Sequence, residues 1–355
     1  MTLEELGYNQ ELERYRVSNG LDSLGVARVI AEHKERYVVK NEVGEHEAEI
    51  LGNLRYTAQG RADFPAVGDW VAISDYDEGK VLIHAILQRK SVIQRQAVGK
   101  RKDVQVIAAN IDSALIVQAV DRDFSINRIQ RYLTICHSSN VDPVIVLNKI
   151  DLVGEDETTR IIGEVQKRVA DVPVYAVSNQ SGEGIEKLKE IIVKGRTYCL
   201  LGSSGVGKST LLNTIAGEQL MKTGAISEHS HRGQHVTTHR EMQVLSNGGI
   251  LIDNPGMREV GIADTSGGLE TTFETILELS GQCRFKDCSH VHEIGCAVTA
   301  AVENGELDRS SYENYLKMER EKEHFEATIA EKRKKGKEFG KIIKHFKNVK
   351  KSNRY

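Results

Sequence analysis

The residues with the clearest chemical potential lie in a glycine-rich stretch from Gly202 to Ser209. Apolar runs at 198–201 and 210–215 flank it, which is the strand-loop-helix context of a phosphate-binding loop. In such a loop the backbone N–H groups and the helix dipole bind phosphate, while a lysine reaches the terminal phosphates. The phosphate-binding residues that we predict are Gly202, Ser203, Ser204, Gly205, Val206, Gly207, Lys208, Ser209 and Thr210. Lys208 is the catalytic candidate, and the Ser209 hydroxyl is a candidate Mg²⁺ ligand.

A second motif, from Asn148 to Asp151, indicates which base is bound. It follows the apolar run 144–147, and the end of a strand is where an open α/β sheet places its ligands. The Asp151 carboxylate can accept hydrogen bonds from guanine N1–H and the exocyclic amine, and adenine offers no matching pair of donors. Asn148 can bridge the base and the loop, the Lys149 stem can pack over the rings, and the segment at Ser178 can offer backbone N–H groups to guanine O6. A solvated turn can carry the same motif, but its combination with a phosphate loop predicts GTP rather than ATP.

Two further segments are expected to contact magnesium and the γ-phosphate. Asp253 follows an apolar run and is expected to hold magnesium through water, and the Gly256 N–H is expected to meet the γ-phosphate. Residues 229–239 lack periodicity and are expected to form a switch, in which Thr237 or Thr238 completes the magnesium shell. The four histidines of this segment could instead hold a second metal, but their spacing matches no tight ligand pattern.

The group that orients the attacking water is not evident from these motifs. Met257 stands where many GTPases place a glutamine, and a thioether cannot usefully hydrogen-bond water. Slow intrinsic turnover is therefore expected. Either His235 positions the water or a binding partner completes the site, and His235 could equally be a surface histidine with no catalytic part.

The order of the motifs adds information that no single motif carries. The guanine-reading motif that begins at Asn148 precedes the phosphate loop, and Asp253 comes last. In an ordinary GTPase the phosphate loop comes first and the base-reading motif follows it. All the parts of the nucleotide site are therefore present in a rotated order, which predicts a circularly permuted P-loop GTPase domain.

A cluster of metal-binding residue types lies within fourteen residues of the C-terminal part, namely Cys283, Cys288, His290 and Cys296. Three thiolates and one imidazole are enough for a closed tetrahedral zinc site. Such a site is structural, because no coordination position remains for water or substrate. The spacing departs from the usual paired Cys-x-x-Cys, and His292 could compete with His290 as the fourth ligand.

The elements that must position these residues follow from the hydrophobic pattern. Short alternating runs between Val26 and Gln94 indicate a small antiparallel barrel of OB type, although strand number alone does not exclude an SH3-like barrel. From Val104 onward, continuous apolar strands alternate with amphipathic helices, which indicates a parallel, doubly wound sheet, and after Gly268 the chain is expected to be helical. The fold class that we predict is a multidomain α/β protein with an OB-type barrel at 1–98, the permuted GTPase domain at 99–264 and a zinc-binding helical domain at 265–355.

The bulk composition is that of a globular protein, because 355 residues with 39% hydrophobic and 28% charged side chains can bury cores in two or three domains. No apolar stretch is long enough to cross a membrane and the start is acidic, unlike a signal peptide, so we expect a cytoplasmic monomer without membrane contact. The net charge of −3 is unevenly distributed, since residues 331–355 carry +9 and the remainder −12. This basic tail is either an arm for RNA or a solvated helix end.

Together these motifs resemble the ribosome small-subunit-dependent GTPase A family of bacterial permuted GTPases. The resemblance covers nearly the whole chain and rests on 65–71 in the barrel, 148–151, the phosphate loop, 233–238 and 283–290. It implies a GTP hydrolase that binds the small (30S) ribosomal subunit and its 16S rRNA in the GTP state, late in subunit maturation, and leaves once the subunit has stimulated hydrolysis to GDP. It also implies Mg²⁺ with the GTP and one structural Zn²⁺ on Cys283, Cys288, His290 and Cys296.

Departures from the family pattern occur at Val236, Asn254, Met257 and Ile294, and none removes a predicted ligand. Val236 makes Thr237 the preferred magnesium ligand. A GTP-sensing RNA-binding assembly chaperone with incidental hydrolysis is an alternative function that Met257 would permit. A P-loop kinase is a third class, against which the guanine-reading motif argues, because a kinase has no need of that filter.

Overall fold

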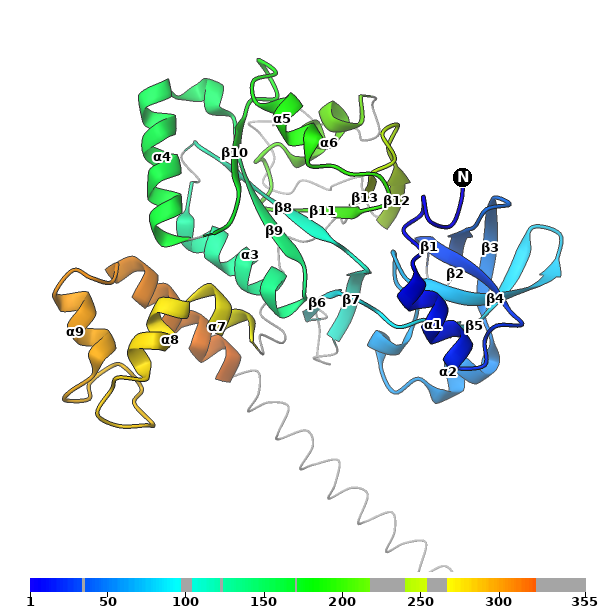
Figure 1. Ribbon diagram of the computed structural model, residues 1–355, viewed down its shortest axis with the longest axis horizontal. Helices are drawn as coiled ribbons and strands as arrows, with labels where there is room; N and C mark the ends of the chain where they lie inside the picture. Colours follow the sequence, from blue (N-terminus) through cyan, green and yellow to red (C-terminus); the bar gives the residue numbers. More distant parts are fainter. Residues whose placement is uncertain are drawn as a thin grey trace, which may run out of the picture.

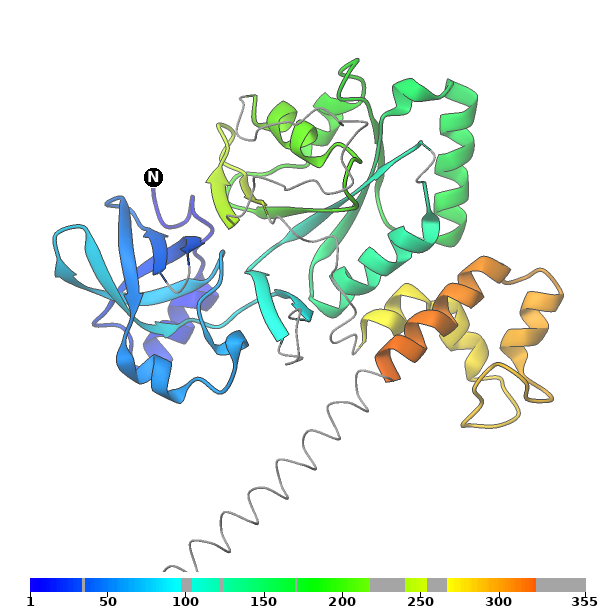
Figure 2. The same ribbon diagram turned by 180° about the vertical axis from the view of Figure 1, so that it is seen from behind.

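A computed structural model of the protein describes residues 1–33, 36–96, 104–121, 124–169, 171–217, 240–253 and 267–323. A β-barrel and a helical module lie on opposite sides of a central α/β domain (Figure 1), and the view from behind shows the same arrangement (Figure 2). The sequence predictions for the switch at 229–239, for residues 254–257 and for the tail at 331–355 lie outside the described residues.

Five short strands close into the barrel: β1 (Gly25–His33), β2 (Arg36–Lys40), β3 (Glu45–Ile50), β4 (Trp70–Asp77) and β5 (Lys80–Ile86). β1 pairs with β2 and β4, β3 pairs with β2 and in parallel with β5, and β4 pairs with β5, so each strand has a neighbour on both sides. Alternate residues such as Ala27 and Val29 belong to a common apolar core. The closed barrel confirms the expected OB type.

Three short helices accompany the barrel: α1 (Gln10–Ser18), α2 (Gly52–Thr57) and η1 (Arg61–Asp63). A hairpin of β6 (Val92–Gln96) and β7 (Val104–Ala109) then leads into the central domain. The sequence pattern did not predict this hairpin as a separate unit. The barrel approaches it so closely that a Cβ on Gly68 would lie 2.1 Å from the carbonyl oxygen of Ala109, so only glycine fits there.

The central domain has a sheet with helices on both faces. Its strands are β8 (Ser113–Ala119), β9 (Asp142–Asn148), β10 (Val174–Val177), β11 (Thr197–Leu201), β12 (Arg240–Val244) and β13 (Ile250–Asp253), and its helices are α3 (Ile126–Ser138), η2 (Ile150–Leu152), α4 (Glu155–Arg168), α5 (Ile185–Glu190) and α6 (Lys208–Ala216). The spatial order is β10-β9-β8-β11-β13-β12, parallel except for β12. The expected parallel, doubly wound sheet is confirmed, with one antiparallel strand added.

Both faces of this sheet are buried, as continuous apolar strands predict. Ala114 and Ile116 of β8 share a core with α3 and α4, whereas the alternate residues Leu115 and Val117 share a core with α5 and α6. The parallel strands carry their carboxyl ends at one edge of the sheet. The segments that follow β9, β10, β11 and β13 are therefore brought together there, which is where ligands bind in such sheets.

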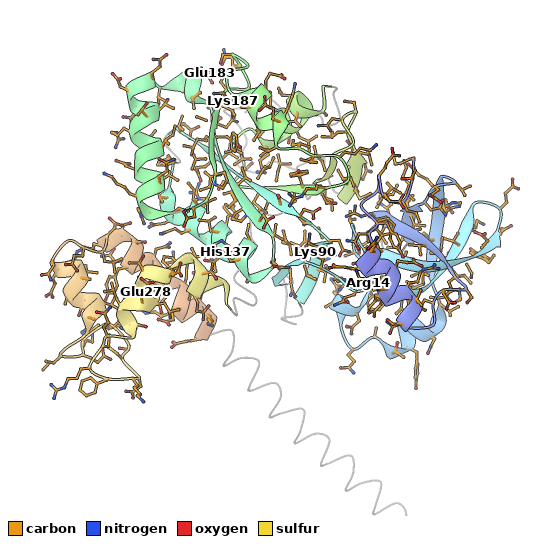
Figure 3. The ribbon with its side chains drawn as sticks, in the orientation of Figure 1. Arg14, Lys90, His137, Glu183, Lys187 and Glu278 are labelled. Atoms are coloured by element: carbon orange, nitrogen blue, oxygen red, sulfur yellow. The ribbon has the colours of Figure 1, made fainter. Side chains whose placement is uncertain are left out.

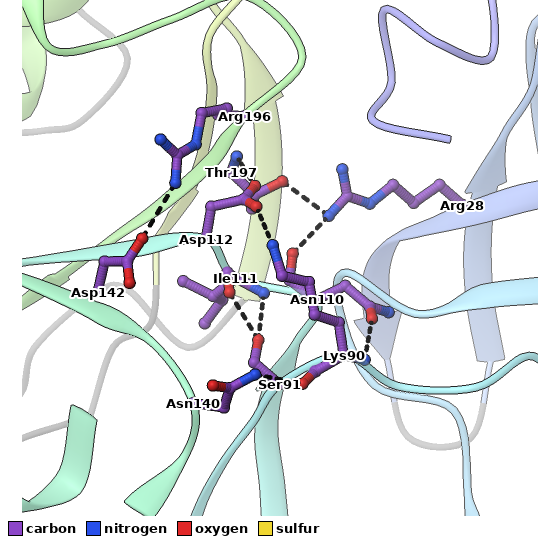
Figure 4. A network of polar contacts seen from close by, with 10 residues as sticks. All are labelled: Arg28, Lys90, Ser91, Asn110, Ile111, Asp112, Asn140, Asp142, Arg196 and Thr197. Carbon is purple, nitrogen blue, oxygen red and sulfur yellow. Dashed lines mark hydrogen bonds and ion pairs between the residues drawn. The ribbon is translucent and has the colours of Figure 1, made fainter. Parts of the chain in front are cut away.

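The barrel and the central domain share one continuous sheet, because β1 also pairs with β12. A polar network lies at this junction (Figure 4), where Lys90 Nζ is 2.7 Å from Asp112 Oδ1 and the Thr197 N–H donates to Asp112 Oδ2 at 2.7 Å. In the same network the Ser91 hydroxyl exchanges hydrogen bonds with the backbone of Ile111. Strand pairing and buried hydrogen bonds thus join the two domains.

The helical module contains α7 (Gly268–Thr272), α8 (Glu274–Ser280) and α9 (Ala297–Glu303), and residues 309–323 are also helical. Its own apolar core includes Leu269, Phe273, Val298 and Met318. This arrangement confirms the expectation of a helical chain after Gly268, and the Cys/His cluster lies between α8 and α9. No helix in the described parts of the chain is long and apolar enough to cross a membrane.

The helical module docks on α3 of the central domain. Gln130 Nε2 donates to the Ser311 hydroxyl at 2.7 Å, and both side chains are buried. Thr134 Oγ1 lies 3.1 Å from the hydroxyl of Thr272 in α7, and His137 Nδ1 lies 3.0 Å from the same hydroxyl. Figure 3 labels His137 where α3 meets the module. The zinc-candidate module and the nucleotide domain therefore contact each other along α3, and Arg168 at the end of α4 adds an ion pair with Asp308 at 3.3 Å.

Candidate nucleotide and metal sites

The predicted phosphate loop connects β11 to α6, whose first residue is Lys208. Gly202 has a φ of +146°, and a Cβ there would lie 2.3 Å from the carbonyl oxygen of Val117 in the neighbouring strand β8. Lys208 reaches back across the loop, where its Nζ donates to the carbonyl oxygens of Gly202 (2.8 Å) and Ser203 (2.5 Å). The loop therefore folds around the lysine ammonium, and Gly202 must be glycine for the loop to pass β8.

Asn148 joins the base-reading motif to the phosphate loop. It is the last residue of β9, it is fully buried, and its Nδ2 donates to the carbonyl oxygen of Val206 at 2.8 Å. Gly207 has a φ of +93°, and a Cβ on it would lie 2.4 Å from that Nδ2 atom. Any side chain at position 207 would displace Asn148. The phosphate loop and the base-reading loop are therefore packed against each other at this glycine.

The other members of the base-reading motif are oriented by neighbouring side chains. The Ser178 hydroxyl donates to Asp151 Oδ1 at 2.5 Å, which directs the carboxylate that is predicted to read guanine. Lys149 has a φ of +65°, and its Nζ lies 2.9 Å from Asp121 Oδ2. Asp121 follows β8, 28 residues before its partner, so no local pattern singled it out.

Two buried amide oxygens of this site have no hydrogen-bond partner among the described residues, namely Oδ1 of Asn148 and Oδ1 of Asn179. A buried polar atom without a partner costs about 1–3 kcal/mol, so native proteins keep such atoms where a polar ligand or water pairs with them. Two such oxygens beside the phosphate loop fit a polar ligand such as a nucleotide. The sequence prediction used only the backbone at this segment and missed the Asn179 side chain.

Tyr132 of α3 also contacts the phosphate loop. Burial raises the pKa of Tyr132 above its ordinary value, and the neighbouring Ser203 side chain opposes this shift. The phenol is thus neutral near pH 7. No sequence motif marks Tyr132, because in the helical pattern of α3 it is an ordinary buried aromatic residue.

The magnesium side of the site is described in part. Ser209 lies in the first turn of α6, and Asp253 is the last residue of β13, the parallel neighbour of β11. Ser209 thus comes after the end of β11 and Asp253 stands at the end of β13, so both lie at the same edge of the sheet. Thr237, His235 and Gly256 lie outside the described residues, so their roles stay predictions.

The metal-binding candidates of the helical module meet in space: the ligand atoms of Cys283, Cys288, His290 and Cys296 all lie within 4.8 Å of one another. Cys283 Sγ is 3.8 Å from Cys296 Sγ, and these sulfurs are 3.6 Å and 3.5 Å from His290 Nδ1. A tetrahedral zinc ion with Zn–S bonds of about 2.3 Å and a Zn–N bond of about 2.0 Å separates two sulfurs by roughly 3.8 Å and sulfur from nitrogen by roughly 3.5 Å. The donor set and its spacing fit zinc. His292 is exposed and is not part of this cluster.

Hydrogen bonds around the cluster hold its loop in place. Glu293 Oε1 accepts from the N–H (2.9 Å) and the hydroxyl (2.6 Å) of Ser289, and Oε2 accepts from two further backbone N–H groups at 3.2 Å. The carbonyl oxygen of His290, a residue with a φ of +60°, accepts from the Tyr312 hydroxyl at 2.6 Å. The ligand loop is thus fixed by the module itself, as a structural metal site requires.

The fold and the arrangement of its loops define the class of this protein, a circularly permuted GTPase. A family model described as RsgA GTPase matches residues 86–263. "Small ribosomal subunit biogenesis GTPase RsgA 2" of Listeria monocytogenes is 42% identical, over 90% of this chain and 89% of that protein. "Small ribosomal subunit biogenesis GTPase RsgA 1" of Bacteroides thetaiotaomicron is 40% identical, over 97% and 96%. The chain belongs to the RsgA GTPase family, and it is a GTP-hydrolysing enzyme.

Solved structures are similar over most of the chain. The crystal structure of YjeQ from Thermotoga maritima has 29% identity and a TM-score of 0.63, covering 84% of this chain and 98% of that one. YloQ, described as a circularly permuted GTPase, has 25% identity and a TM-score of 0.58, covering 85% and 96%. A family model described as ABC transporter also matches residues 185–354. That range contains the phosphate loop, which many nucleotide-binding proteins share, but not the motif at 148–151, so the GTPase assignment stands.

Proposed function

We propose that this protein uses its GTPase cycle to time its action on the small (30S) ribosomal subunit late in maturation. The GTP form binds the subunit and its 16S rRNA, the subunit stimulates hydrolysis, and the GDP form leaves. The names of the similar proteins support this assignment, since they describe small ribosomal subunit biogenesis GTPases. The observation that carries the proposal is the hydrogen bond from Asn148 to Val206, because it joins a guanine-reading motif to a phosphate loop.

Guanine recognition in this proposal falls to Asp151. Its carboxylate accepts from the N1–H and the exocyclic amine of the base, and the hydrogen bond from Ser178 holds it in one orientation. The ion pair with Asp121 fixes the head of Lys149, so that its stem can lie along the base. Adenine would leave the Asp151 carboxylate without its donors, and ATP is therefore rejected.

Phosphate binding falls to the loop and to Lys208. In this structure the ammonium of Lys208 contacts two loop carbonyls, and it exchanges them for terminal phosphate oxygens when GTP binds. Ser209, Thr237 and Asp253 would hold Mg²⁺, which neutralises the charge that develops on the phosphates. The backbone N–H groups from Gly202 to Thr210 supply the remaining donors.

The attacking water is positioned either by His235 or by a group of the ribosomal subunit, because Met257 cannot do so. The Gly256 N–H meets the γ-phosphate and so senses whether it is present. A site that a partner completes turns over slowly alone and quickly on that partner. Where the subunit supplies the group that positions the water, its binding stimulates hydrolysis.

The outer parts of the molecule are proposed to contact RNA. One structural zinc on the Cys/His cluster gives the helical module a fixed shape. The barrel, this module and the basic tail at 331–355 then contact the ribosomal RNA backbone. We place the domain boundaries at residues 98 and 264 and expect a monomer that acts in the cytoplasm.

GTP turnover by the purified protein, alone and with small ribosomal subunits, tests this function. ATP and large subunits serve as controls. A rise that needs both GTP and small subunits supports the proposal, whereas a slow rate under all conditions favours a GTP-sensing assembly chaperone with incidental hydrolysis. Lys208→Ala separates these two when subunit binding and turnover are measured independently, because only the chaperone would act without turnover.

A further inference from the structure

Asn179, which follows β10, contacts the phosphate loop beside Asn148. Its Nδ2 donates to the carbonyl oxygen of Gly207 at 3.3 Å, while Asn148 Nδ2 donates to the preceding carbonyl, that of Val206, at 2.8 Å. A Cβ on Gly207 would lie 2.4 Å from Asn148 Nδ2 and 3.3 Å from Asn179 Nδ2. Two asparagines from two adjacent strand ends thus hold two consecutive carbonyls of the phosphate loop.

The direction of these carbonyls matters for phosphate binding. In a trans peptide unit the C=O of one residue and the N–H of the next point in opposite directions, and the described residues contain no cis peptide bond. The carbonyls of Val206 and Gly207 point toward the asparagines, so the N–H groups of Gly207 and Lys208 point away from the base-reading side. N–H groups at this position are the ones that bind phosphate at a helix N-terminus.

The loop that carries Asn179 is held firmly from within. The Ser178 hydroxyl accepts from the N–H groups of Gln180 (3.1 Å) and Ser181 (3.0 Å), and the backbone N–H of Ser178 donates to the carbonyl of Glu183 at 3.0 Å. The same hydroxyl orients the predicted guanine reader, Asp151. Asn179 is therefore the neighbour of Ser178, which orients Asp151, and it also contacts the phosphate loop at Gly207. Only one peptide bond separates the residue that orients the base reader from the residue that contacts the phosphate loop.

The other polar atom of the Asn179 side chain, Oδ1, indicates that a ligand binds beside it. This oxygen is buried and has no partner among the described residues, as is also true of Asn148 Oδ1. The amide cannot be turned to satisfy this oxygen at Gly207, because two carbonyl oxygens would then face each other. A bound nucleotide, or a water that it orders, is the donor that would pair with this oxygen.

We propose that Asn179 is a positioning residue for guanine nucleotides, which ties the base-reading loop to the phosphate loop so that each is preformed for the other. This inference rests on the proposed guanine-nucleotide site. Asn179 acts on affinity, because its contact with the Gly207 carbonyl exists before the phosphates react. It acts alike on GDP and GTP, because this contact is with the loop itself and not with the γ-phosphate.

Titration of the purified full-length protein with a fluorescent GDP analogue tests the proposal. Loss of one hydrogen bond of ordinary net strength in Asn179→Ala should weaken GDP and GTP binding by about five- to tenfold, with kcat at saturating GTP unchanged. Asn179→Asp has nearly the same shape but no donor, and it places a negative charge beside the Gly207 carbonyl, so its loss should be larger. Gln180→Ala, an exposed neighbour in the same loop, is the matched control and should bind like the wild type.

Inosine diphosphate separates positioning from general damage. It lacks the exocyclic amine that Asp151 reads, so the ratio of GDP to IDP affinity reports on Asp151 alone, and Asn179→Ala should keep the wild-type ratio. Wild-type affinity in Asn179→Ala, a collapsed GDP/IDP ratio, or a change confined to kcat would each overturn the proposal. If Asn179→Ala fails to fold, Asn179→Ser provides the same comparison. A wild-type protein that binds ADP as well as GDP would instead refute the guanine site itself.

Discussion

Arg28 Nη2 in the barrel donates a hydrogen bond to Thr197 Oγ1 in β11 at 2.9 Å, although 169 residues separate them (Figure 4). The same guanidinium donates to the carbonyl oxygens of Leu6 (2.5 Å), Gly68 (3.2 Å) and Asn110 (3.2 Å). Burial lowers the pKa of Arg28 to about 10, which still leaves the side chain charged near pH 7. One buried cation thus joins the N-terminal turn, the barrel and the central domain.

Replacement of Arg28 should therefore destabilise the junction. Arg28→Met keeps much of the side-chain volume but leaves several buried acceptors unpaired, so we expect the free energy of unfolding to fall by about 3 kcal/mol. Chemical denaturation followed by circular dichroism measures this change. Arg14→Met, on the exposed face of α1 (Figure 3), is the matched control and should be close to neutral. Equal stability of the two variants would show that the Arg28 contacts contribute little.

Removal of the phosphate-loop lysine should abolish most of the activity. We propose that Lys208 contacts the terminal phosphates, and preorganised charges of this kind contribute about a hundredfold or more to turnover. We expect Lys208→Ala to lower subunit-stimulated GTP turnover by at least about a hundredfold. Lys187→Ala, on the exposed side of α5, should leave turnover unchanged. A Lys208→Ala rate within a few-fold of the wild type would contradict the assigned role.

Metal analysis of the purified protein should find about one zinc per chain, held by the Cys/His cluster. Cys296→Ser and His290→Ala each remove one of the four converging ligands, so both should lose the metal and lower the melting temperature. His292→Ala is the matched control, because His292 is exposed and outside the cluster, and it should retain the metal. Zinc loss in His292→Ala with retention in His290→Ala would reverse the ligand assignment.

The docking of the helical module should weaken in acid. Burial lowers the pKa of His137 below its ordinary value of 6.5, so the unfolded chain binds a proton there at higher pH than the folded chain does. The stability that the neutral ring contributes is therefore complete above about pH 6.5 and is lost as the pH falls from there toward the folded-state pKa.

His137→Gln retains a hydrogen-bonding group for Thr272 but cannot titrate. We expect its melting temperature to fall less than that of the wild type between about pH 7.5 and about pH 5.5. Thermal melts of the two proteins across this range provide the measurement. Parallel pH profiles would rule His137 out as the source of acid sensitivity.

Local spacing by itself determined the chemistry of both sites. The phosphate loop from Gly202 to Ser209 is continuous in sequence, and the cluster from Cys283 to Cys296 spans fourteen residues, so short-range order alone brings their groups near one another. The main strands of the sheet were also predictable, because burial on both faces makes β8, β9 and β11 continuously apolar. The order of the motifs sufficed to indicate the circular permutation.

Tertiary structure alone decided which distant residues meet. The contact between Asn148 and Val206, 58 residues apart, and the pairing of β1 with β12 depend on the order of strands in the sheet, which no periodicity in the chain records. The tertiary structure also showed that the barrel is closed and that His290, not His292, belongs to the Cys/His cluster. Strand partners and ligand directions depend on long-range contacts, so the sequence left both questions open. Asn179 is an ordinary loop amide in the sequence, and it gains a role only because parallel strands place their carboxyl ends side by side.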